Sequence, residues 1–473
     1  MSLVTSRYNL TVPYEDGALL FNANSGAILH LHSEEGVELA DALCAYPALF
    51  DLQGVDEVIL ERLLKAGFIL DDTQDELSIV RERFNFSRQN ASAVITVMVT
   101  NDCNLGCYYC FQSRSEDNLA GDKEANTLAY LKQRIESCGK KQVHINWYGG
   151  EPMLKRDYIS RLSYALQAFA EDSGIRFEAS ILSNGTFWPK NPLAFVEEHK
   201  LTTVQITFDG TEATHNKIRR RRGKAGPEYN QFAEAVRVID AIHKDCHVEV
   251  RFNLGPRNTQ EIFDFVSFAL QRGWLKEGSR TKLQLAKISP YSKGVDFIRS
   301  DQLLYAEFKQ IVDRVRKLIP DHFFDSNTAL GELPKPRRAV CSAVAEDSFI
   351  VGADRKVYNC GLQVGEKTSA VGSLERHNGN TVEQAQASWW RSFDPTERPK
   401  CKVCTFLPLC WGSCPKLHLE GDDHYLDEQS EYWRSTLPKR ILNSVGATTE
   451  VAFNESQQFK TGKPTELDPT AGT

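Results

Sequence analysis

Three closely spaced cysteines, Cys103, Cys107 and Cys110, are the residues of this 473-residue chain with the most distinctive chemistry. Iron–sulfur clusters are held by cysteine thiolates, and a complete cubane needs four of them. Three cysteines with no fourth close by suit a cluster that keeps one iron open for another ligand. A zinc site is the alternative, but structural zinc takes four ligands and usually uses C-x2-C pairs. The spacing therefore favours an iron–sulfur cluster.

A second group of cysteines lies near the C-terminus. Its members are Cys341, Cys360, Cys401, Cys404, Cys410 and Cys414. The chain has twelve cysteines, and its first residues lack the basic-then-apolar pattern of a secretory signal. We therefore expect a cytoplasmic protein, where a reducing environment keeps thiols free and clustered cysteines indicate metal or redox chemistry. Cys44, Cys138 and Cys246 lie in apolar or helical surroundings and are interpreted as ordinary core or surface residues.

Composition excludes some classes of function. The chain is 41% hydrophobic and 25% charged, with no apolar run near the ~18 residues that a membrane span requires. Its net charge of −7 does not favour nonspecific binding of nucleic acid. The basic run Arg219–Arg222 is local, and we interpret it as a solvated loop, with a patch for an acidic substrate as the alternative.

The elements that must position the first three cysteines alternate between strands and helices from about residue 93 to 290. The expected strands are Val94–Thr100, Val143–Tyr148, Phe177–Ser183, Thr203–Phe208, Val248–Leu254 and Leu283–Ile288. The expected helices between them include Thr127–Ser137, Tyr158–Ala170, Asn230–His243 and Thr259–Gln271. Six such units predict an α/β fold with a parallel sheet closed partly or wholly into a barrel. In such barrels the chemistry lies at the C-terminal ends of the strands.

The regions on either side differ from this pattern. The first 90 residues predict a small antiparallel sheet followed by two helices and a linker. Its parts are the strands Tyr8–Val12, Ala18–Asn22 and Ala27–Leu31, the helices Ser33–Cys44 (with Ser33 as N-cap) and Val55–Ala66, and the linker stretches Asp71–Glu76 and Arg81–Asn90. Residues 335–420 show little periodicity, as expected where metal clusters replace a core. Residues 450–473 are polar, and we expect them to be disordered.

Four further polar motifs follow the expected strands. They are Gly149-Gly150-Glu151-Pro152 after the second, Ser183-Asn184-Gly185 after the third, Asp209-Gly210 after the fourth, and Arg251 with Asn253 on the fifth. Glycines let a backbone approach a ligand that a side chain would exclude, and Ser and Asn offer hydrogen-bond partners. A plain turn, a satisfied strand-end aspartate and a charged barrel arginine are the ordinary alternatives.

The cysteine motif C-x3-C-x2-C after a first barrel strand, together with GGEP some forty residues later, resembles the radical S-adenosylmethionine (SAM) superfamily. The resemblance implies that SAM chelates the open iron of a [4Fe–4S] cluster. One electron then cleaves SAM to methionine and a 5′-deoxyadenosyl radical, which abstracts hydrogen from an unactivated carbon. It also implies a reducing partner such as flavodoxin or ferredoxin. The residues that it places near SAM are Tyr109, Gly149, Gly150, Glu151, Ser183, Asn184, Asp209 and Arg251.

The arrangement C-x2-C-x5-C-x3-C from Cys401 to Cys414 is similar to a SPASM domain, which implies two auxiliary [4Fe–4S] clusters. A zinc ribbon on Cys401 and Cys404 is the alternative. The resemblance assigns Cys341, Cys360 and Cys414 to auxiliary cluster I, and Cys401, Cys404 and Cys410 to auxiliary cluster II. No cysteine follows Cys414, so auxiliary cluster II needs an open iron or another ligand, the nearest candidates being Asp422, Asp423 and His424. Arg355 stands where the family has glycine.

The N-terminal residues resemble the winged-helix-like peptide-recognition domain of enzymes that modify ribosomally made peptides. The resemblance implies that a precursor peptide adds a strand to a free sheet edge; a structural cap on the barrel is the alternative. The expected domains are a peptide-recognition domain (1–85), a partial (β/α)6 radical SAM barrel (90–320), a SPASM domain (335–445) and the tail (450–473).

The function implied is that of a peptide maturase, which abstracts hydrogen from the precursor and installs a thioether or carbon–carbon crosslink. Two alternatives stay open. An anaerobic sulfatase maturase, which forms formylglycine, has an acid–base aspartate directly after the second SPASM cysteine, whereas Gly361 follows Cys360 here. A noncatalytic iron–sulfur regulatory protein would not turn over SAM.

Overall fold

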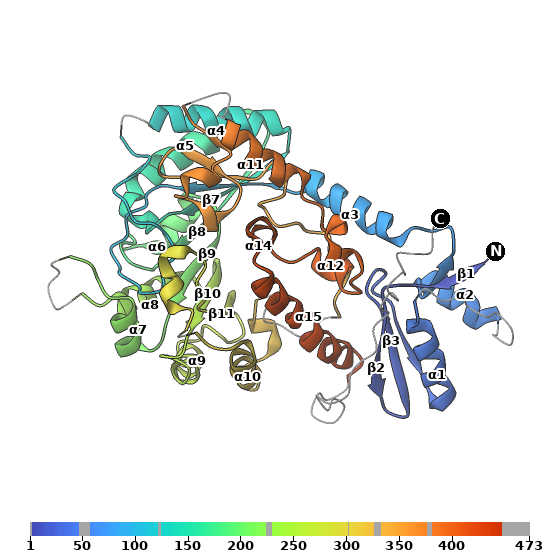
Figure 1. Cartoon of the computed structure of the whole chain (residues 1–473). Coiled ribbons are helices and arrows are strands. Elements are labelled where there is room, and N and C mark those ends of the chain that lie inside the picture. The colour runs from blue at the N-terminus through green and yellow to red at the C-terminus, as the bar shows by residue number, and fades with distance from the viewer. Residues whose placement is uncertain are drawn as a thin grey trace. The chain divides into compact units, whose positions relative to one another are not determined.

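A computed structural model describes residues 2–46, 57–121, 124–223, 229–300, 302–325, 333–375 and 381–446 (Figure 1). The chain divides into two compact units, which do not follow the domain boundaries expected from the sequence. The first unit comprises residues 1–91, 330–341 and 393–473, and the second comprises residues 92–329 and 342–392. The expected domain boundaries stay predictions.

The second unit is built on six parallel strands that lie side by side in chain order. They are β6 (Ala93–Met98), β7 (Gln142–Tyr148), β8 (Arg176–Ser183), β9 (Leu201–Phe208), β10 (His247–Leu254) and β11 (Thr281–Lys287). All six expected strands are confirmed. Among the described strands β11 pairs with β10 alone, so the sheet is an open, partial barrel rather than a closed one.

Helices cover the outer face of this sheet (Figure 1). They are α4 (Glu124–Cys138), α5 (Arg156–Asp172), α6 (Pro192–Glu198), α7 (Glu212–Ile218), α8 (Gln231–Ile242), α9 (Glu261–Gln271) and α10 (Tyr305–Arg316). Apolar residues at helical spacing on α8, such as Phe232, Val236 and Ile239, are buried against the strands. Phe208 at the end of β9 packs against Phe265 with ring centroids 4.9 Å apart. The core between sheet and helices thereby fixes the strand ends.

Three strands that the sequence did not predict extend the sheet beyond β6. They are β12 (Phe349–Val351), β13 (Lys356–Tyr358) and β14 (Gly372–Ser373), followed by α11 (Thr381–Ser392). β12 runs parallel to β6, with Ile350 opposite Thr96, and β13 and β14 continue antiparallel. Two- and three-residue strands are too short to give a periodic pattern, which explains why they were missed. The segment that carries Cys360 is thus attached to the strand that precedes the first cysteine group.

The N-terminal sheet of the first unit is confirmed as an antiparallel meander. It consists of β2 (Asn9–Tyr14), β3 (Gly17–Asn22) and β4 (Ile28–Leu31), and is accompanied by β1 (Leu3–Thr5), β5 (Ile69–Asp71), α1 (Ser33–Cys44) and α2 (Glu57–Ala66). Residues 55 and 56 of the second expected helix lie outside the described residues. Ser33 was wrong as an N-cap: the cap position is His32, and Ser33 is the first helical residue, with a φ of 69°.

The expected linker is wrong for Arg81–Asn90, because residues 76–90 form the helix α3 (Glu76–Asn90), whereas residues 72–75 of the first expected stretch do form a turn. Its charged surface hides the signal, but Asp75 caps the helix by accepting hydrogen bonds from the backbone N–H groups of Leu77 and Ser78. Val80 and Phe84, four residues apart, are buried on one face.

Helix α3 packs on the cysteine-rich C-terminal segment inside the same unit. The ring centroid of Phe84 lies 6.3 Å from that of Phe393 and 5.4 Å from that of Trp411. Arg81 donates to the hydroxyl of Thr396 at 2.9 Å. The helices of this segment are α12 (Pro399–Lys402), α13 (Leu407–Cys410), α14 (Pro415–Glu420) and α15 (Asp423–Ser444). The expected disordered tail lies outside the described residues.

Six short 3-10 helices complete the second unit and this segment: η1 (Pro152–Lys155), η2 (Lys293–Ile298), η3 (Asp321–Phe323), η4 (Gly361–Gln363), η5 (Lys367–Ser369) and η6 (Pro395–Glu397). In the part of the chain that the structure describes, no helix has both the length and the apolar character needed to cross a bilayer.

Candidate active site

The cysteine loop follows β6 at the C-terminal end of the parallel sheet, where barrel enzymes carry their chemistry. Cys103, Cys107 and Cys110 are half-buried free thiols. Burial raises the pKa of Cys103 to about 12, and the nearby carboxylate of Glu151 adds to the shift. Burial also raises the pKa of Cys107, while Arg219 opposes the shift. Iron binding at Cys103 and Cys107 therefore has to displace a proton from each thiol.

The spacing of the thiols fits a cluster better than a single ion. Among the described residues, neither cysteine group brings three ligand atoms within 4.8 Å of one another. One zinc ion with Zn–S bonds of about 2.3 Å needs sulfurs about 3.8 Å apart. Three soft thiolates at wider spacing, in one loop, match the donor set of an iron–sulfur cluster.

The basic run Arg219–Arg222 holds the cysteine loop from outside. The backbone N–H of Gly106 donates to the carbonyl of Arg220 at 2.7 Å, and that of Arg222 donates to the carbonyl of Asn104 at 2.8 Å. The guanidinium of Arg222 also donates to the carbonyl of Cys103 at 3.2 Å. The interpretation of this run as a solvated loop holds only in part: Arg220 and Arg222 are exposed, but Arg219 is buried and the backbone of the run is hydrogen-bonded to the cysteine loop.

Gly149 and Gly150, at the end of β7, pack against the backbone that leads into Cys103. The backbone N–H of Gly150 donates to the carbonyl of Thr100 at 2.8 Å, and that of Glu151 donates to the carbonyl of Asp102 at 2.9 Å. A side chain on Gly150 would collide with the carbonyl of Asp102. The glycines are thus required by the approach of two backbone segments of this chain to each other.

The side chain of Glu151 is fully buried and forms hydrogen bonds with residues at the end of β8. One carboxylate oxygen accepts from the hydroxyl of Ser183 at 2.8 Å, and the other accepts from the backbone N–H of Asn184 at 2.7 Å. Burial raises the pKa of Glu151 to about 7, although these hydrogen bonds oppose the shift. Glu151 therefore positions the Ser183–Gly185 loop, a role that the sequence did not suggest.

In the loop after β8, the side chains of Ser183 and Asn184 already have hydrogen-bond partners within the protein. The hydroxyl of Ser183 donates to Glu151 and accepts from Gly185 N–H at 3.0 Å and from Trp188 Nε1 at 3.1 Å. A hydroxyl has one proton and two lone pairs, so the Ser183 hydroxyl can form no further hydrogen bond. The side-chain amide of Asn184 points at the cysteine loop: it donates to Asn104 at 3.0 Å and lies 3.9 Å from the sulfur of Cys103.

A buried polar cluster joins the cysteine loop to β9 and β10. The hydroxyl of Tyr109 donates to the carboxylate of Asp209, 2.7 Å from its nearer oxygen, and accepts from Arg219 at 2.9 Å and from Asn253 at 3.0 Å. Burial raises the pKa of Asp209, and Arg219 and the Tyr109 hydroxyl oppose that rise. The structure therefore brings together Tyr109 and Asp209, two of the residues named in the sequence analysis, and adds Arg219.

Arg251 completes the inner wall of the barrel beside this cluster. Its Nε donates to the side-chain oxygen of Asn253 at 2.9 Å, and its Nη1 donates to that of Gln284 at 3.1 Å. Asn258, which the sequence analysis did not name, donates to the backbone carbonyls of Asp209 and Asn253 at 2.7 and 2.8 Å. Asn258 lies in the loop after β10, and Arg219 directly follows α7 at the start of the basic run, so neither position indicates its role in the sequence.

The second cysteine group is divided between the units. Cys401, Cys404 and Cys410 lie together in the first unit, and burial raises the pKa of Cys401 to about 12 and that of Cys410 to about 11, with neighbouring thiols adding to both shifts. Cys341 and Cys414 belong to the same unit, whereas Cys360 belongs to the second.

A histidine that the sequence analysis did not name lies beside this thiol group. A Cβ placed on Gly412 would be 3.5 Å from both the sulfur of Cys401 and Nε2 of His418. His424, near the start of α15, forms contacts of its own with the protein. Nε2 of His418 hydrogen-bonds to the carbonyl of Gly412 at 2.7 Å, so His424 stays the histidine candidate for the missing ligand.

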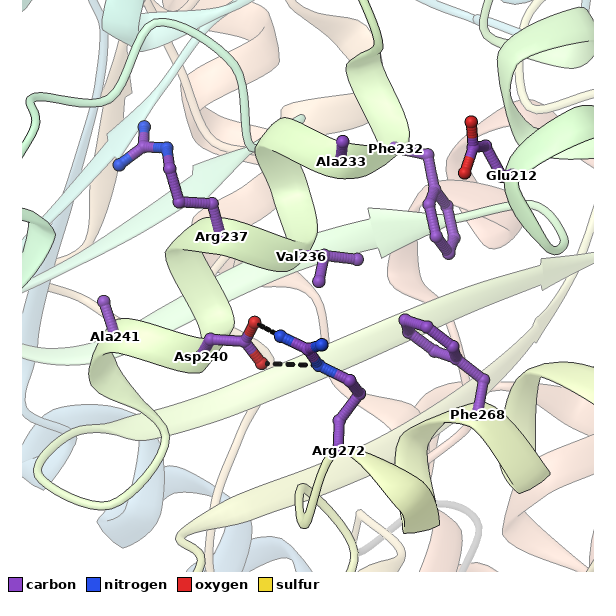
Figure 2. A pocket seen from close by; sticks show the side chains of 9 residues that line it. All are labelled: Glu212, Phe232, Ala233, Val236, Arg237, Asp240, Ala241, Phe268 and Arg272. Atoms are coloured by element: carbon purple, nitrogen blue, oxygen red, sulfur yellow. Dashed lines mark hydrogen bonds and ion pairs between the residues drawn. The ribbon is translucent and has the colours of Figure 1, made fainter.

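One groove of the second unit lies away from these residues. It is lined by side chains of α7, α8 and α9 and by Arg272 directly after α9, which pairs with Asp240 (Figure 2). Neither a cysteine nor a strand end contributes to the lining. The helices there cover the outer face of the sheet, so the groove is not the candidate active site.

Comparison with known proteins supports the cysteine-loop site. Residues 97–269 match the model of the Radical SAM superfamily. These residues form a radical SAM domain. The chain is 27% identical over 327 residues to a serine-type anaerobic sulfatase-maturating enzyme from Klebsiella aerogenes, covering 66% of this chain and 77% of that one. It is 22% identical over 343 residues to the mycofactocin maturase MftC of Mycolicibacterium smegmatis, covering 69% and 78%.

Among solved structures, native anSMEcpe with bound AdoMet is similar, with a TM-score of 0.57 and 16% identity. The match covers 75% of this chain and 99% of that one. At this identity the likeness shows a shared fold. The domain match and the named relatives support an iron–sulfur radical SAM enzyme.

Proposed function

We propose that this radical SAM enzyme is a peptide maturase that abstracts hydrogen from a ribosomally made precursor peptide and installs a thioether or carbon–carbon crosslink. The observation that carries the proposal is an open strand edge in the first unit, to which a peptide could bind. Among the described strands, β4 pairs with β3 alone, so one of its edges is open. Such an edge can accept a further strand through main-chain hydrogen bonds.

A shallow apolar groove with two basic residues lies beside that edge. Its lining consists of Ile28, Leu29, Arg62, Lys65, Ala66 and Phe68, from β4, α2 and the residues after it. An extended peptide on β4 would place alternate side chains against these apolar residues. Arg62 and Lys65 favour a peptide segment with acidic residues. We therefore propose that the leader of the precursor binds here.

In the second unit, Cys103, Cys107 and Cys110 would hold the [4Fe–4S] cluster, leaving one iron for SAM. The loaded site supplies a 5′-deoxyadenosyl radical, the group that takes hydrogen from the peptide. The amide of Asn184 next to the Cys103 sulfur would fix the orientation of that ligand, as outer-shell hydrogen bonds do at metal sites.

The residues near SAM divide into two kinds in this proposal. The backbone carbonyls of Gly149 and Gly150, the backbone beside Tyr109, and the side chains of Asp209 and Arg251 would contact SAM. Glu151 and Ser183 would act indirectly, because their side-chain hydrogen bonds already connect the GGEP loop with the next strand end. Arg219 would hold Asp209 and Tyr109 in place.

The six cysteines from Cys341 to Cys414 would hold two auxiliary [4Fe–4S] clusters, as the SPASM resemblance implies. Asp422, Asp423 or His424 would supply the ligand that no cysteine provides, or one iron would stay open. These clusters would accept the electron left after crosslinking, and a reduced flavodoxin or ferredoxin would supply the starting electron. An enzyme with so many clustered thiols needs a reducing compartment, so we place it in the cytoplasm.

Sulfatase maturation is the second candidate, because the Klebsiella relative carries that name. Gly361 follows Cys360, so the position of the acid–base aspartate expected for that reaction has no carboxylate. The two reactions leave different products. Formylglycine is an aldehyde that reacts with hydrazides, whereas a crosslink is inert to them and joins two residues of the peptide.

The proposed function is tested by anaerobic co-expression of the enzyme with candidate precursor peptides, chosen from short open reading frames beside the gene, and by mass spectrometry of those peptides. We expect a peptide that has lost hydrogen and does not react with hydrazides. A hydrazide-reactive product would favour sulfatase-type chemistry, and an unmodified peptide with abundant 5′-deoxyadenosine would contradict the choice of substrate.

Leader recognition is tested separately by calorimetric titration of the leader peptide. Arg62→Glu/Lys65→Glu should weaken binding by about tenfold or more, since about 1.4 kcal/mol corresponds to one tenfold step. Lys190→Glu/Lys276→Glu changes the net charge equally at exposed positions of the other unit and is the matched control. Equal affinity of both variants would show that the leader does not use the β4–α2 groove.

A further inference from the structure

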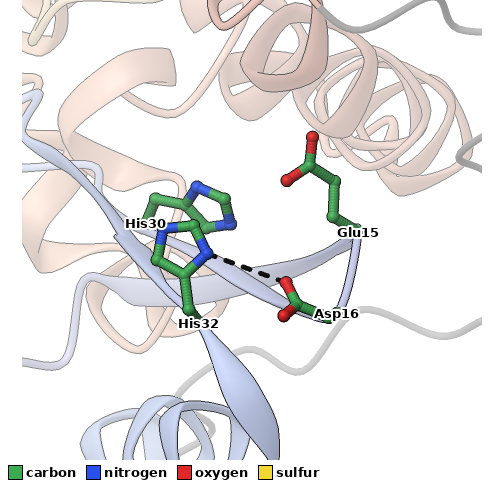
Figure 3. A group of neighbouring side chains, drawn as sticks. All are labelled: Glu15, Asp16, His30 and His32. Carbon is green, nitrogen blue, oxygen red and sulfur yellow. Dashed lines mark ion pairs between the residues drawn. The ribbon is translucent and has the colours of Figure 1, made fainter.

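Four side chains with metal-binding atoms meet at one end of the N-terminal sheet (Figure 3). Glu15 and Asp16 form the two-residue turn between β2 and β3, in which Tyr14 pairs with Gly17. His30 lies on β4 and His32 directly follows it. Residues two apart in an extended segment face the same side, so both imidazoles project toward the turn. These elements are adjacent, because β3 pairs with both β2 and β4.

The ligand atoms of the four side chains already lie within 4.8 Å of one another. Nδ1 of His32 is 3.7 Å from Oδ1 of Asp16, and the two imidazole centroids are 3.7 Å apart. A tetrahedral ion with bonds of about 2.0–2.1 Å needs its ligand atoms about 3.4 Å apart. Glu15, Asp16 and His32 are exposed and His30 is half-buried, so small side-chain rotations can close the difference.

Ordinary surface pairing does not account for the whole group. Asp16 and His32 form one exposed pair, of a kind that contributes little to stability. It leaves out Nε2 of His30, an atom that is buried and has no hydrogen-bond partner in the described part of the structure. A buried nitrogen without a partner is costly, and a coordinated ion would satisfy it.

We infer that Glu15, Asp16, His30 and His32 bind one divalent transition-metal ion of the zinc class. Two imidazoles and two carboxylates make a donor set that suits zinc and its neighbours, rather than the all-oxygen sets that calcium and magnesium prefer. The ion would join the β2–β3 turn to the end of β4. It would therefore fasten the sheet whose open edge serves as the leader site in the proposed function, although the metal site itself does not depend on that proposal.

The test uses the full-length enzyme, anaerobically loaded with iron and sulfide and then freed of loosely bound metal. Zinc is titrated into this protein by calorimetry, and bound zinc is counted by mass spectrometry after desalting. We expect the wild type to bind one more zinc ion per chain than His30→Gln/His32→Gln. Iron content should be the same in both, because all cysteines are retained.

His322→Gln is the matched control, since His322 is an exposed histidine that lies 3.5 Å from a carboxylate oxygen of Glu277 but has no second histidine in that pair. It should keep the extra zinc. Glu15→Gln/Asp16→Asn should weaken binding without removing either imidazole, which guards against misfolding of the histidine variant. The inference would be overturned if both cluster variants bound zinc with the same stoichiometry and affinity as the wild type. It would also be overturned if His322→Gln lost as much bound zinc as the histidine variant. Leader binding that fails while zinc still binds would count against the peptide proposal alone.

Discussion

At the scale of single residues, Arg219 stands out because it is buried and bridges the cysteine loop and the barrel. It donates to Tyr109 and lies 3.5 Å from a carboxylate oxygen of Asp209. Asp209 is fully buried, and its pKa is raised by burial and held down by Arg219. Removing one partner of such a pair leaves the other charge buried without compensation.

We therefore expect Arg219→Gln to lower the free energy of unfolding by about 3–5 kcal/mol and to weaken SAM binding. Arg299→Gln is the control, because both side chains of its ion pair with Asp296 are exposed, and it should change stability by less than about 1 kcal/mol. Denaturant unfolding of both anaerobic proteins measures this. Similar effects of the two substitutions would show that the buried bridge has no special role.

His215 gives a prediction about pH. It is fully buried beside Phe208 and Phe232, both ring nitrogens lack hydrogen-bond partners among the described residues, and burial, with nearby Arg219 adding, places its pKa well below 6.5. The unfolded chain takes up a proton near pH 6.5 while the folded chain does not, so His215 reduces stability as the pH falls below that value.

We expect His215→Leu to raise the free energy of unfolding by about 1–2 kcal/mol. The variant should also lose less stability than the wild type when the pH falls from 6.5 to 5. Thermal melting across this range checks it. A wild type and a variant whose melting temperatures fall in parallel would contradict the assignment.

At the scale of elements, the GGEP loop and the cysteine loop are packed backbone to backbone. We expect Gly150→Ala to displace the residues before Cys103, because its Cβ would meet the carbonyl of Asp102. Overpacking of this kind costs about 1–3 kcal/mol, and here it should also lower the iron retained per chain. Gly294→Ala, whose Cβ would meet only the hydroxyl of Ser292 at 3.8 Å, is the control. Unchanged iron content in Gly150→Ala would contradict this account of the loop.

The elements also show what the sequence could predict. The six parallel strands were predictable because they are apolar runs bounded by turn residues and separated by amphipathic helices. Helix α3 was not, because only Val80 and Phe84 mark its buried face within a charged segment. The cysteines and GGEP were predictable from spacing, whereas the roles of Glu151, Ser183 and Arg219 depend on contacts between segments far apart in the chain.

At the scale of the whole molecule, the N-terminal sheet and the 401–414 cysteines share one compact unit. Deleting the N-terminal residues would also remove α3, whose Phe84 packs against Phe393 and Trp411. Point substitutions therefore test peptide recognition without disturbing this packing. The unit also makes Cys401, Cys404 and Cys410 separable from the SAM site, because Cys103, Cys107 and Cys110 belong to the other unit.

With four irons to a cluster, the reconstituted wild type should hold about twelve irons per chain. Cys401→Ala/Cys404→Ala should lose about four of them and still cleave SAM. Iron analysis with assay of 5′-deoxyadenosine checks both. About four irons in the wild type, with zinc at the later cysteines, would contradict the two auxiliary clusters.

The central claim is that the cysteine-loop site generates a radical that takes hydrogen from a precursor peptide. The most direct measurement incubates the holoenzyme with SAM, dithionite and a fully deuterated candidate precursor, and analyses 5′-deoxyadenosine by mass spectrometry. We predict deuterium in 5′-deoxyadenosine from the wild type and no 5′-deoxyadenosine from Cys107→Ala of unchanged fold. Unlabelled 5′-deoxyadenosine alongside a modified peptide, or continued SAM cleavage by Cys107→Ala, would contradict the claim.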